Sequence, residues 1–125
     1  MNKYIELEHH ILKMFFKHMI LIKIYHFQTS SFAGHNASDK YFEKFLPLMD
    51  KFMELMQGKY GKIKMSECRI KICEISDENI KDVLEEFIKY CKLCEKIFVG
   101  QSELLNIKDE MIANTEQLKY LLSFK

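Results

Sequence analysis

The sequence predicts an all-α fold, and three observations support that prediction. Only one proline and four glycines occur in 125 residues, whereas a β-sandwich needs a turn about every 8–12 residues and builds its turns from those residue types. Hydrophobic residues make up 48% of the chain and aromatic residues 13%, which supplies a packed core and excludes a disordered chain. Apolar residues recur at helical spacing in four separate segments. We therefore expect residues 1–125 to form a single domain, a four-helix bundle.

The first predicted helix covers residues 4–27. It stops where the polar run Gln28-Thr29-Ser30-Ser31 replaces the helical pattern. A histidine, His18, shares the apolar face, and we interpret it as a hydrogen-bonded core residue rather than a metal ligand. That face consists of Ile11, Met14, Phe15, His18, Ile22 and Tyr25.

The second predicted helix covers residues 36–57. Asn36 or Ser38 can cap its N-terminus, and Gly58 can close its C-terminus. Its predicted core face consists of Tyr41, Phe45, Leu48, Phe52 and Leu55.

The third helix should begin after Ser76, Asp77 and Glu78, because a capping residue followed by acids suits the positive end of a helix. Gly100 ends this helix, and the fourth helix starts at Ser102. The third helix carries an apolar stripe of Ile80, Leu84, Phe87, Cys91, Cys94 and Phe98. The fourth helix carries Leu104, Ile107, Met111, Leu118, Leu121 and Leu122.

The connection between the second and third helices, residues 59–75, is much longer than the other two gaps. Fully extended, it could reach roughly 50 Å, whereas a helix of about 22 residues spans roughly 33 Å. The short gaps predict two antiparallel hairpins, and the long connection can cross the bundle between them, which is the ferritin-like topology. Apolar and basic residues alternate within the connection, so we expect extended chain or a small β-hairpin there.

The charges of the chain are almost balanced, with 19 basic and 18 acidic side chains and a net charge of +1. This balance argues against a general nucleic-acid binder, which needs a basic excess. The single arginine, Arg69, leaves no arginine cluster for phosphate. No signal peptide is evident, and the most apolar stretch, residues 14–27, is too short and too charged to span a membrane. We expect a cytoplasmic protein.

Four cysteines without a secretion signal predict reduced thiols. Their spacing formally fits a four-thiolate zinc site, with Cys68 and Cys73 on the connection and Cys91 and Cys94 on the third helix. The last two lie on the apolar stripe of that helix, where cysteine acts as a small apolar residue. We therefore favour buried thiols over a zinc site.

The outward face of the second helix carries side chains that can bind metal. On a helical wheel, the four polar residues of this face lie at about −40°, 0°, +20° and +60° relative to Asp39. Apolar residues share the same side, and a helix that is apolar on two faces usually has a second partner. The polar set is His35, Asp39, Asp50 and Glu54, and the apolar set is Phe42, Leu46 and Met53.

The spacing of the polar set predicts two half-sites. His35 and Asp39 are four residues apart, as are Asp50 and Glu54, but Asp39 and Asp50 are 11 residues apart, roughly 16 Å along the helix axis. Metal–ligand bonds are about 2 Å long, so one ion cannot join the two pairs within one chain. A two-fold axis beside Lys44 would bring the pairs together from two chains. Such ligands suit iron(II), manganese or zinc.

The run from His26 through His35-x-x-x-Asp39 to Asp50-x-x-x-Glu54 resembles the Dps proteins, the mini-ferritins of the ferritin-like superfamily. In that family a histidine at the end of the first helix, a second histidine, two aspartates and a further acid form a ferroxidase site across a dimer interface. Residues 104–124 also look like the last helix of that family. The chain is similar as well to uncharacterised Dps-like proteins of large DNA viruses.

The resemblance implies a ferroxidase that oxidises iron(II) with peroxide or oxygen and stores or detoxifies iron inside a shell of twelve chains. It implies that Asp39 and Glu54 bind one iron together, and that His26, His35 and Asp50 complete the dinuclear site. It is consistent with a cytoplasmic protein, or with a virion protein where the viral resemblance holds.

Some features depart from the Dps pattern and leave a second function open. The gap of nine residues between His26 and His35 is shorter than is usual in that family. Pro47 lies inside the second helix, where it removes a backbone hydrogen bond at a cost of about 3 kcal/mol. No lysine-rich tail precedes the first helix, so tail-mediated DNA binding is not supported. The alternative is a non-catalytic ferritin-like protein with a structural or DNA-compacting role.

Overall fold

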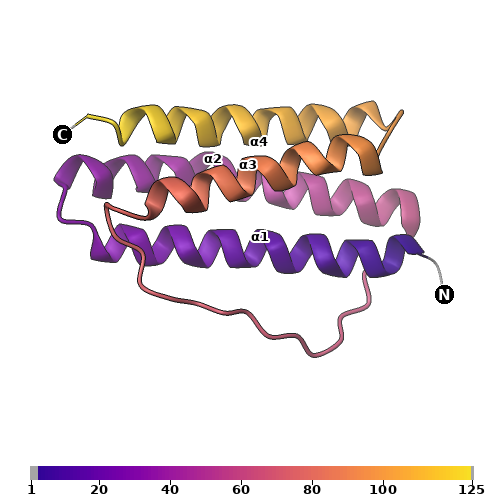
Figure 1. Cartoon of the computed structure of the whole chain (residues 1–125). Coiled ribbons are helices and arrows are strands. Elements are labelled where there is room, and N and C mark those ends of the chain that lie inside the picture. The colour runs from indigo at the N-terminus through magenta and orange to yellow at the C-terminus, as the bar shows by residue number, and fades with distance from the viewer. Residues whose placement is uncertain (1–2, 125) are drawn as a thin grey trace.

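The computed structural model describes residues 3–124 and consists of four helices in that range (Figure 1). Their bounds are α1 Lys3–Gln28, α2 Phe32–Tyr60, α3 Ile80–Ile97 and α4 Ser102–Leu121. No strand occurs among the described residues, so the predicted all-α four-helix bundle is confirmed. None of the helices in this part of the chain is long and apolar enough to cross a lipid bilayer.

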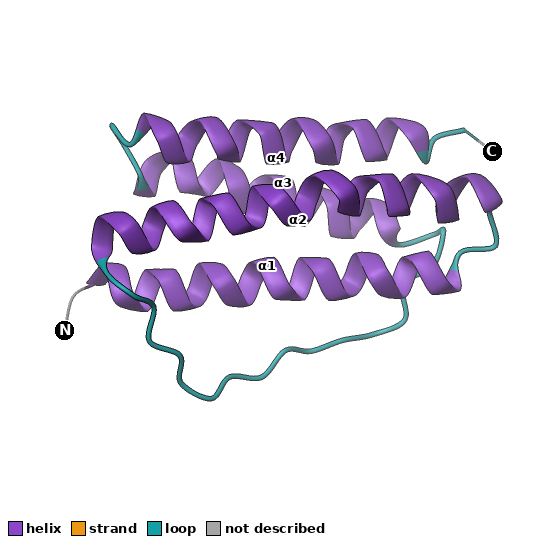
Figure 2. Cartoon of the chain, turned by 180° about the vertical axis from the view of Figure 1, so that it is seen from behind, coloured by secondary structure: helices purple, strands orange, loops and turns teal. Residues whose placement is uncertain are grey.

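The helices form a bundle in which each one packs against two neighbours. α1 contacts α2 and α3, and α4 contacts the same two helices. Figures 1 and 2 show that α1 and α2 are antiparallel, that α3 and α4 are antiparallel, and that α2 and α3 run in the same direction. The connection between α2 and α3 follows the outer side of α1 from one end of the bundle to the other.

This connection contains neither helix nor strand in residues 61–76, so of the two conformations expected there, extended chain or a small β-hairpin, the hairpin does not form. The physical reason is its span, because a hairpin would shorten a segment that has to reach from one end of the bundle to the other. Side-chain amides hold both of its ends. Gln57 Oε1 accepts a hydrogen bond from the amide of Ile63 at 3.1 Å, and Gln28 Oε1 accepts one from the amide of Ile75 at 2.8 Å.

Aromatic rings from three helices meet in the core around Phe15 of α1. Its ring centroid lies 6.4 Å from that of Phe45 and 5.4 Å from that of Phe52, both on α2. Phe87 of α3 lies 6.3 Å away on the other side. The edge-to-face geometry of the two α2 contacts is the arrangement that aromatic quadrupoles favour. These ring contacts fix the position of α1 relative to α2 and α3.

A buried hydrogen-bonded chain crosses the core from α1 to α4. His18 Nε2 lies 2.7 Å from the hydroxyl of Tyr41, which lies 2.9 Å from Thr115 Oγ1. Because Thr115 donates its proton to the carbonyl of Met111, it accepts from Tyr41, and His18 therefore donates to Tyr41. The His18 ring also stacks on Phe87 with centroids 3.8 Å apart. The interpretation of His18 as a core histidine is confirmed.

The bounds of α2 differ from the prediction at both ends. The helix begins at Phe32, and Ser31 caps it by accepting a hydrogen bond from the amide of Gly34 at 3.0 Å. Ser38 lies inside the helix instead of capping it, as does Asn36. At the other end α2 passes through Gly58 and stops at Gly61, whose φ of 100° suits glycine.

Asp77, just before α3, ties the α1–α2 turn to the rest of the bundle. Its carboxylate accepts hydrogen bonds from the hydroxyl of Thr29 at 2.6 Å, the hydroxyl of Tyr25 at 3.0 Å and the amide of Ser30 at 3.1 Å. These bonds, that from Thr29 above all, lower the pKa of Asp77. The two helices that carry the predicted site residues are thus fixed relative to α3.

We predict that His18 makes the protein sensitive to acid. Burial lowers the pKa of His18 from 6.5 to about 3. The unfolded chain therefore binds a proton first, so the stability that neutral His18 contributes is complete above pH 6.5 and is lost as the pH falls towards 3. Over that interval the free energy of unfolding should fall by up to about 1.4 kcal/mol per pH unit. Urea titrations at several pH values measure the free energy of unfolding. This free energy should depend less on pH in His18→Gln than in the unmodified protein, and the same pH dependence in both proteins would contradict the prediction.

We predict that Asp77→Asn lowers the free energy of unfolding by about 1 kcal/mol, because one amide oxygen cannot accept all three hydrogen bonds that the carboxylate accepts. Urea denaturation measures the change. Glu116→Gln, on the exposed side of α4, is the matched control and should leave stability unchanged. Equal stability of the two variants would show that the Asp77 bonds do not hold the turn.

Candidate metal centre

Three of the five predicted ligands meet where α1 ends and α2 begins. His26 lies in the last turn of α1, and His35 and Asp39 lie near the start of α2. His26 Nε2 is 3.7 Å from Asp39 Oδ1. The rings of His26 and His35 stack with centroids 3.8 Å apart and an interplanar angle of 22°. The short α1–α2 turn therefore brings these three side chains together within one chain.

The two histidines hold each other through their backbones. His26 Nδ1 lies 3.0 Å from the carbonyl oxygen of His35, and His35 Nδ1 lies 2.9 Å from the carbonyl oxygen of His26. A carbonyl oxygen only accepts hydrogen bonds, so Nδ1 carries the proton in both neutral rings. This tautomer leaves the lone pair of each Nε2 available to a metal ion. The hydrogen bond from Nδ1 to the carbonyl oxygen of the other histidine fixes the orientation of each ring.

Ser38 strengthens this arrangement from the buried side of α2. Its hydroxyl lies 2.9 Å from His26 Nδ1 and donates towards the carbonyl oxygens of Gly34 and His35. Sequence reasoning treated Ser38 as a candidate cap and missed this role. The only available signal was its spacing, three and four residues after His35 and Gly34, which places its hydroxyl within reach of those carbonyls.

The glycine at position 34 permits the close approach of the two helices. A Cβ built there would lie 2.5 Å from the Tyr25 hydroxyl and 3.0 Å from Thr29 Oγ1. Any larger residue would push the first turn of α2 away from the end of α1. The stacked histidines need that proximity.

Burial divides the site into an anchored part and an accessible part. The His26 side chain is 7% exposed, whereas that of Asp39 is 59% exposed, and His35 is exposed as well. A ligand can therefore reach Asp39 and His35 from solvent. His26 forms the inner wall.

Asp50 and Glu54 are exposed on the same helix but do not reach the histidines. Asp50 follows Asp39 by 11 residues, roughly 16 Å along α2. Among the side chains that the structure describes, no three histidine, cysteine, aspartate or glutamate residues are placed so as to hold a metal ion.

The face between the two half-sites is apolar in part. Leu46 is 40% exposed and Phe42 is half-buried. Phe27 and Phe32, which flank the α1–α2 turn, are 72% and 79% exposed. Lys23 lies over this surface, with its Nζ 5.3 Å from the ring centroids of both Phe27 and Phe42. Large exposed apolar side chains of this kind are typical of protein–protein interfaces.

One residue that we assigned to this outward face, Met53, does not belong to it. Met53 is only 7% exposed and belongs to the core of its own chain. The reason is that α2 packs against both α1 and α4, so its buried face is wider than a single stripe and includes Met49 and Met56 as well.

The four cysteines do not come together. Cys91 and Cys94 are buried in α3, and burial raises the pKa of Cys94 to about 11 and raises that of Cys91 as well. Cys68 and Cys73 are exposed on the connection. The preference for buried thiols on α3 is confirmed.

A family profile matches residues 26–122 of the chain, from His26 almost to the end of the described residues. The profile is that of a family of unknown function, DUF5856. The chain belongs to this family. All five predicted ligands lie within the matched region. No curated protein and no solved structure matches the chain.

We predict that both imidazoles adopt the Nδ1–H form in solution, because each Nδ1 faces a carbonyl oxygen. Nitrogen-detected NMR, at a pH where both imidazoles are neutral, should show a protonated Nδ1 and an unprotonated Nε2 for His26 and His35. His18 is the internal control, because it donates through Nε2 and should show the opposite pattern. An Nε2–H form at His26 or His35 would contradict the geometry.

Proposed function

We propose that this protein is a Dps-like iron-binding ferroxidase that acts as a dimer or a larger homo-oligomer. The observation that carries the proposal is the reciprocal pair of His26 and His35, in which each ring has its Nδ1 against a carbonyl and the Nε2 of His26 lies 3.7 Å from the carboxylate of Asp39. Imidazole and carboxylate ligands suit iron(II), and also manganese or zinc. Iron is the substrate here, and it supplies the electrons that peroxide or oxygen accepts.

The spacing along α2 supports a composite site between two chains. His35 and Glu54 share a midpoint between residues 44 and 45, and Asp39 and Asp50 share the same midpoint. A two-fold axis at this point would bring both pairs into register at once, with α2 of each chain antiparallel to the other. The exposed side chain of Leu46 lies close to that midpoint and would be buried by the contact.

The residues divide the chemistry between them in this proposal. Asp39 of one chain and Glu54 of the other would hold one iron through charged oxygens. His26, His35 and Asp50 would complete the pair of sites. A metal ion binds through an Nε2 lone pair, and the carbonyl partners of Nδ1 select the tautomer that leaves Nε2 without a proton in each ring.

The path of the chain agrees with a ferritin-like assignment. In Figures 1 and 2 two antiparallel helix pairs are joined by a connection that follows the length of α1, and α2 and α3 run in the same direction. Ferritin-like bundles have one such long connection. The shell of twelve chains is the part of the proposal that follows from the resemblance to Dps alone.

A second candidate function is a non-catalytic ferritin-like protein that compacts DNA or has a structural role. The connection favours it, because four basic side chains on this segment are exposed to solvent. These are Lys62, Lys64, Arg69 and Lys71. A basic extended segment can contact a phosphate backbone even in a chain of near-zero net charge.

We predict that Asp39→Ala and Glu54→Ala each lower the rate of iron(II) oxidation at least tenfold, because each removes a charged ligand from every site. The rise of ferric absorbance measures the rate. Glu116→Gln, on the exposed side of α4, should oxidise iron at the rate of the unmodified protein.

Mixing the two variants tests whether the site is shared between chains. A dimer of one Asp39→Ala chain and one Glu54→Ala chain has one doubly damaged site and one intact site. Refolding an equal mixture should therefore restore about a quarter of the original rate, since about half of the dimers are mixed. If the mixture oxidises iron(II) no faster than either variant alone, the site is not shared between two chains. Unchanged rates in both single variants, together with salt-sensitive DNA retention, would favour the second function.

A further inference from the structure

The two exposed cysteines of the chain lie on one short stretch of the connection between α2 and α3. Cys68 and Cys73 are five residues apart and exposed to solvent, whereas Cys91 and Cys94 are buried in α3. All four cysteines belong to the described part of the chain, so each exposed thiol has one other exposed thiol in its own chain to react with. Neither the metal proposal nor the family assigns a role to this pair.

The stretch between the two thiols has no backbone structure that opposes a turn. Across residues 64–73, no backbone N–H or C=O group has a hydrogen-bond partner among the described residues. The stretch contains no proline. The entropic cost of closing a loop falls as the loop becomes shorter, and flexible loops of about ten residues close within about 100 ns. The two thiols can therefore meet without the loss of a hydrogen bond.

The connection is held at both ends, and the distance between these ends limits its length. Gln57 Oε1 accepts a hydrogen bond from the amide of Ile63, and Gln28 Oε1 accepts one from the amide of Ile75. Gln28 ends α1 beside the start of α2 at Phe32, and Gln57 lies roughly 38 Å further along the axis of α2. The chain from Ile63 to Ile75 reaches at most roughly 40 Å. The connection therefore has little spare length.

A disulfide between Cys68 and Cys73 would shorten this connection. In extended chain their Cα atoms are roughly 17 Å apart, whereas a disulfide holds them at about 6 Å. The reach from Ile63 to Ile75 would then fall to roughly 29 Å, less than the roughly 38 Å between the two glutamines. Ile75 is only 2% exposed and belongs to the core, whereas Ile63 is half-buried. We therefore expect the bond at Ile63 to open first.

We propose that Cys68 and Cys73 form a reversible disulfide in response to hydrogen peroxide, and that this disulfide releases the connection from Gln57. The connection, which follows the outer side of α1 (Figures 1 and 2), is thus a redox-sensitive strap. The inference is independent of the metal proposal, since none of the predicted iron ligands lies on this segment.

The oxidation takes place in two steps. In the first, the sulfur of one thiol attacks a peroxide oxygen, the O–O bond breaks, and water leaves, so that a sulfenic acid remains. In the second, the sulfur of the other thiol attacks the sulfenic sulfur, the S–S bond forms and the S–O bond breaks. The oxygen leaves with the thiol proton as a second water. The two sulfurs lose two electrons, which the peroxide accepts, and a dithiol reductant reverses the reaction by thiol–disulfide exchange.

Peptide mapping of the full chain tests the disulfide. The reduced protein is treated with equimolar hydrogen peroxide, alkylated under denaturing conditions and digested with trypsin. Trypsin cleaves after Arg69 and Lys71, between the two cysteines, so the Cys68 and Cys73 peptides should stay joined until they are reduced. The two cysteines of α3 should be recovered in alkylated form. A covalent dimer on a non-reducing gel, or alkylation of both exposed thiols, overturns the proposal.

Single variants test whether one thiol resolves the sulfenic acid of the other. Cys68→Ser and Cys73→Ser should each form no disulfide within the chain. The remaining exposed thiol should instead keep a sulfenic acid, which dimedone traps. Both positions are exposed, so neither variant should lose stability. Dimedone labelling of the unmodified protein that is as strong as that of the variants overturns the proposal.

Hydrogen exchange tests the release of the strap. In the oxidised protein the amide of Ile63 should exchange at least tenfold faster than in the reduced protein, because its hydrogen bond to Gln57 opens. The amide of Ile75 should keep its rate. Equal exchange rates of Ile63 in the two forms overturn the proposal.

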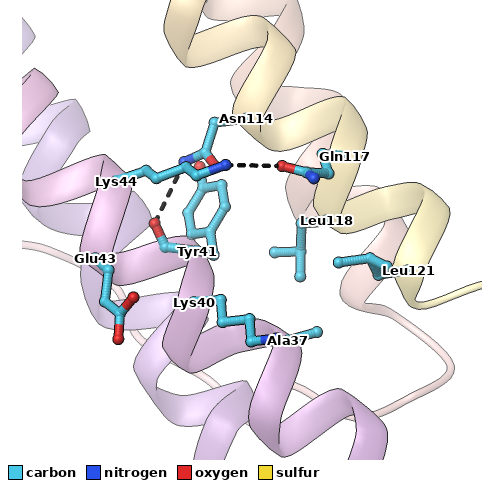
Figure 3. Close-up of a pocket in the computed structure, with 9 residues that line it drawn as sticks. All are labelled: Ala37, Lys40, Tyr41, Glu43, Lys44, Asn114, Gln117, Leu118 and Leu121. Atoms are coloured by element: carbon cyan, nitrogen blue, oxygen red, sulfur yellow. Dashed lines mark hydrogen bonds between the residues drawn. The ribbon is translucent and has the colours of Figure 1, made fainter.

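Gln57→Ala links the strap to the thiols. Because this variant lacks the hydrogen bond that opposes shortening, its ratio of disulfide to dithiol in a glutathione redox buffer should be about fivefold higher. Gln117→Ala is the matched control, since it also removes a glutamine Oε1 that accepts one hydrogen bond, from Lys44 at 3.3 Å (Figure 3), but on α4. The control should keep the ratio of the unmodified protein. The same ratio in Gln57→Ala and Gln117→Ala overturns the proposal.

Discussion

The turn that joins α1 to α2 is held by hydrogen bonds on two sides, and the position of the candidate metal centre depends on both. On one side, Asp77 accepts three hydrogen bonds from the end of α1 and the turn. On the other side, His26 and His35 each donate to the carbonyl oxygen of the other. The first set positions the turn against α3, and the second fixes how closely α1 approaches α2. Gly34 is needed for both, because a Cβ would collide with the Tyr25 hydroxyl.

Helical periodicity was enough to predict the helices and most of their buried faces, including His18, because burial follows from the angle of a residue on its helix. It did not decide between the two conformations expected for residues 61–76, extended chain or a small β-hairpin, since the alternating pattern is local and the span of the segment is set by the distance between two helix ends. It also misplaced the start of α2, because backbone geometry decides which residue caps a helix, and the possible caps Ser31, Asn36 and Ser38 lie within eight positions of one another. Met53 was assigned to the wrong face because a wheel does not show how many neighbours a helix has.

The candidate site was predictable to the extent that it depends on spacing along one helix. His35 and Asp39 lie on the same side of α2 because they are four residues apart. His26 lies beside them because the turn between α1 and α2 is short. The orientation of the imidazoles did not follow from the sequence, since their partners are backbone carbonyls, which every residue has. Nor could one chain reveal how Asp50 and Glu54 are used, because their partners in the proposal belong to a second molecule.

A site divided between two chains would link metal binding to association. The histidine half-site is already oriented by the fold of one chain, so little ordering is required of it when a metal arrives. The other half-site lies on an exposed helix surface and, in the proposal, would gain its partners only through the dimer. If each ion contacts both chains, iron must strengthen the dimer by the same factor by which the dimer strengthens iron binding. The apolar contact around Leu46 could then be weak by itself, and the metal would supply the remaining association energy. In this proposal a modest, partly apolar interface is what the chemistry requires, because an interface of moderate strength lets the concentration of iron control assembly.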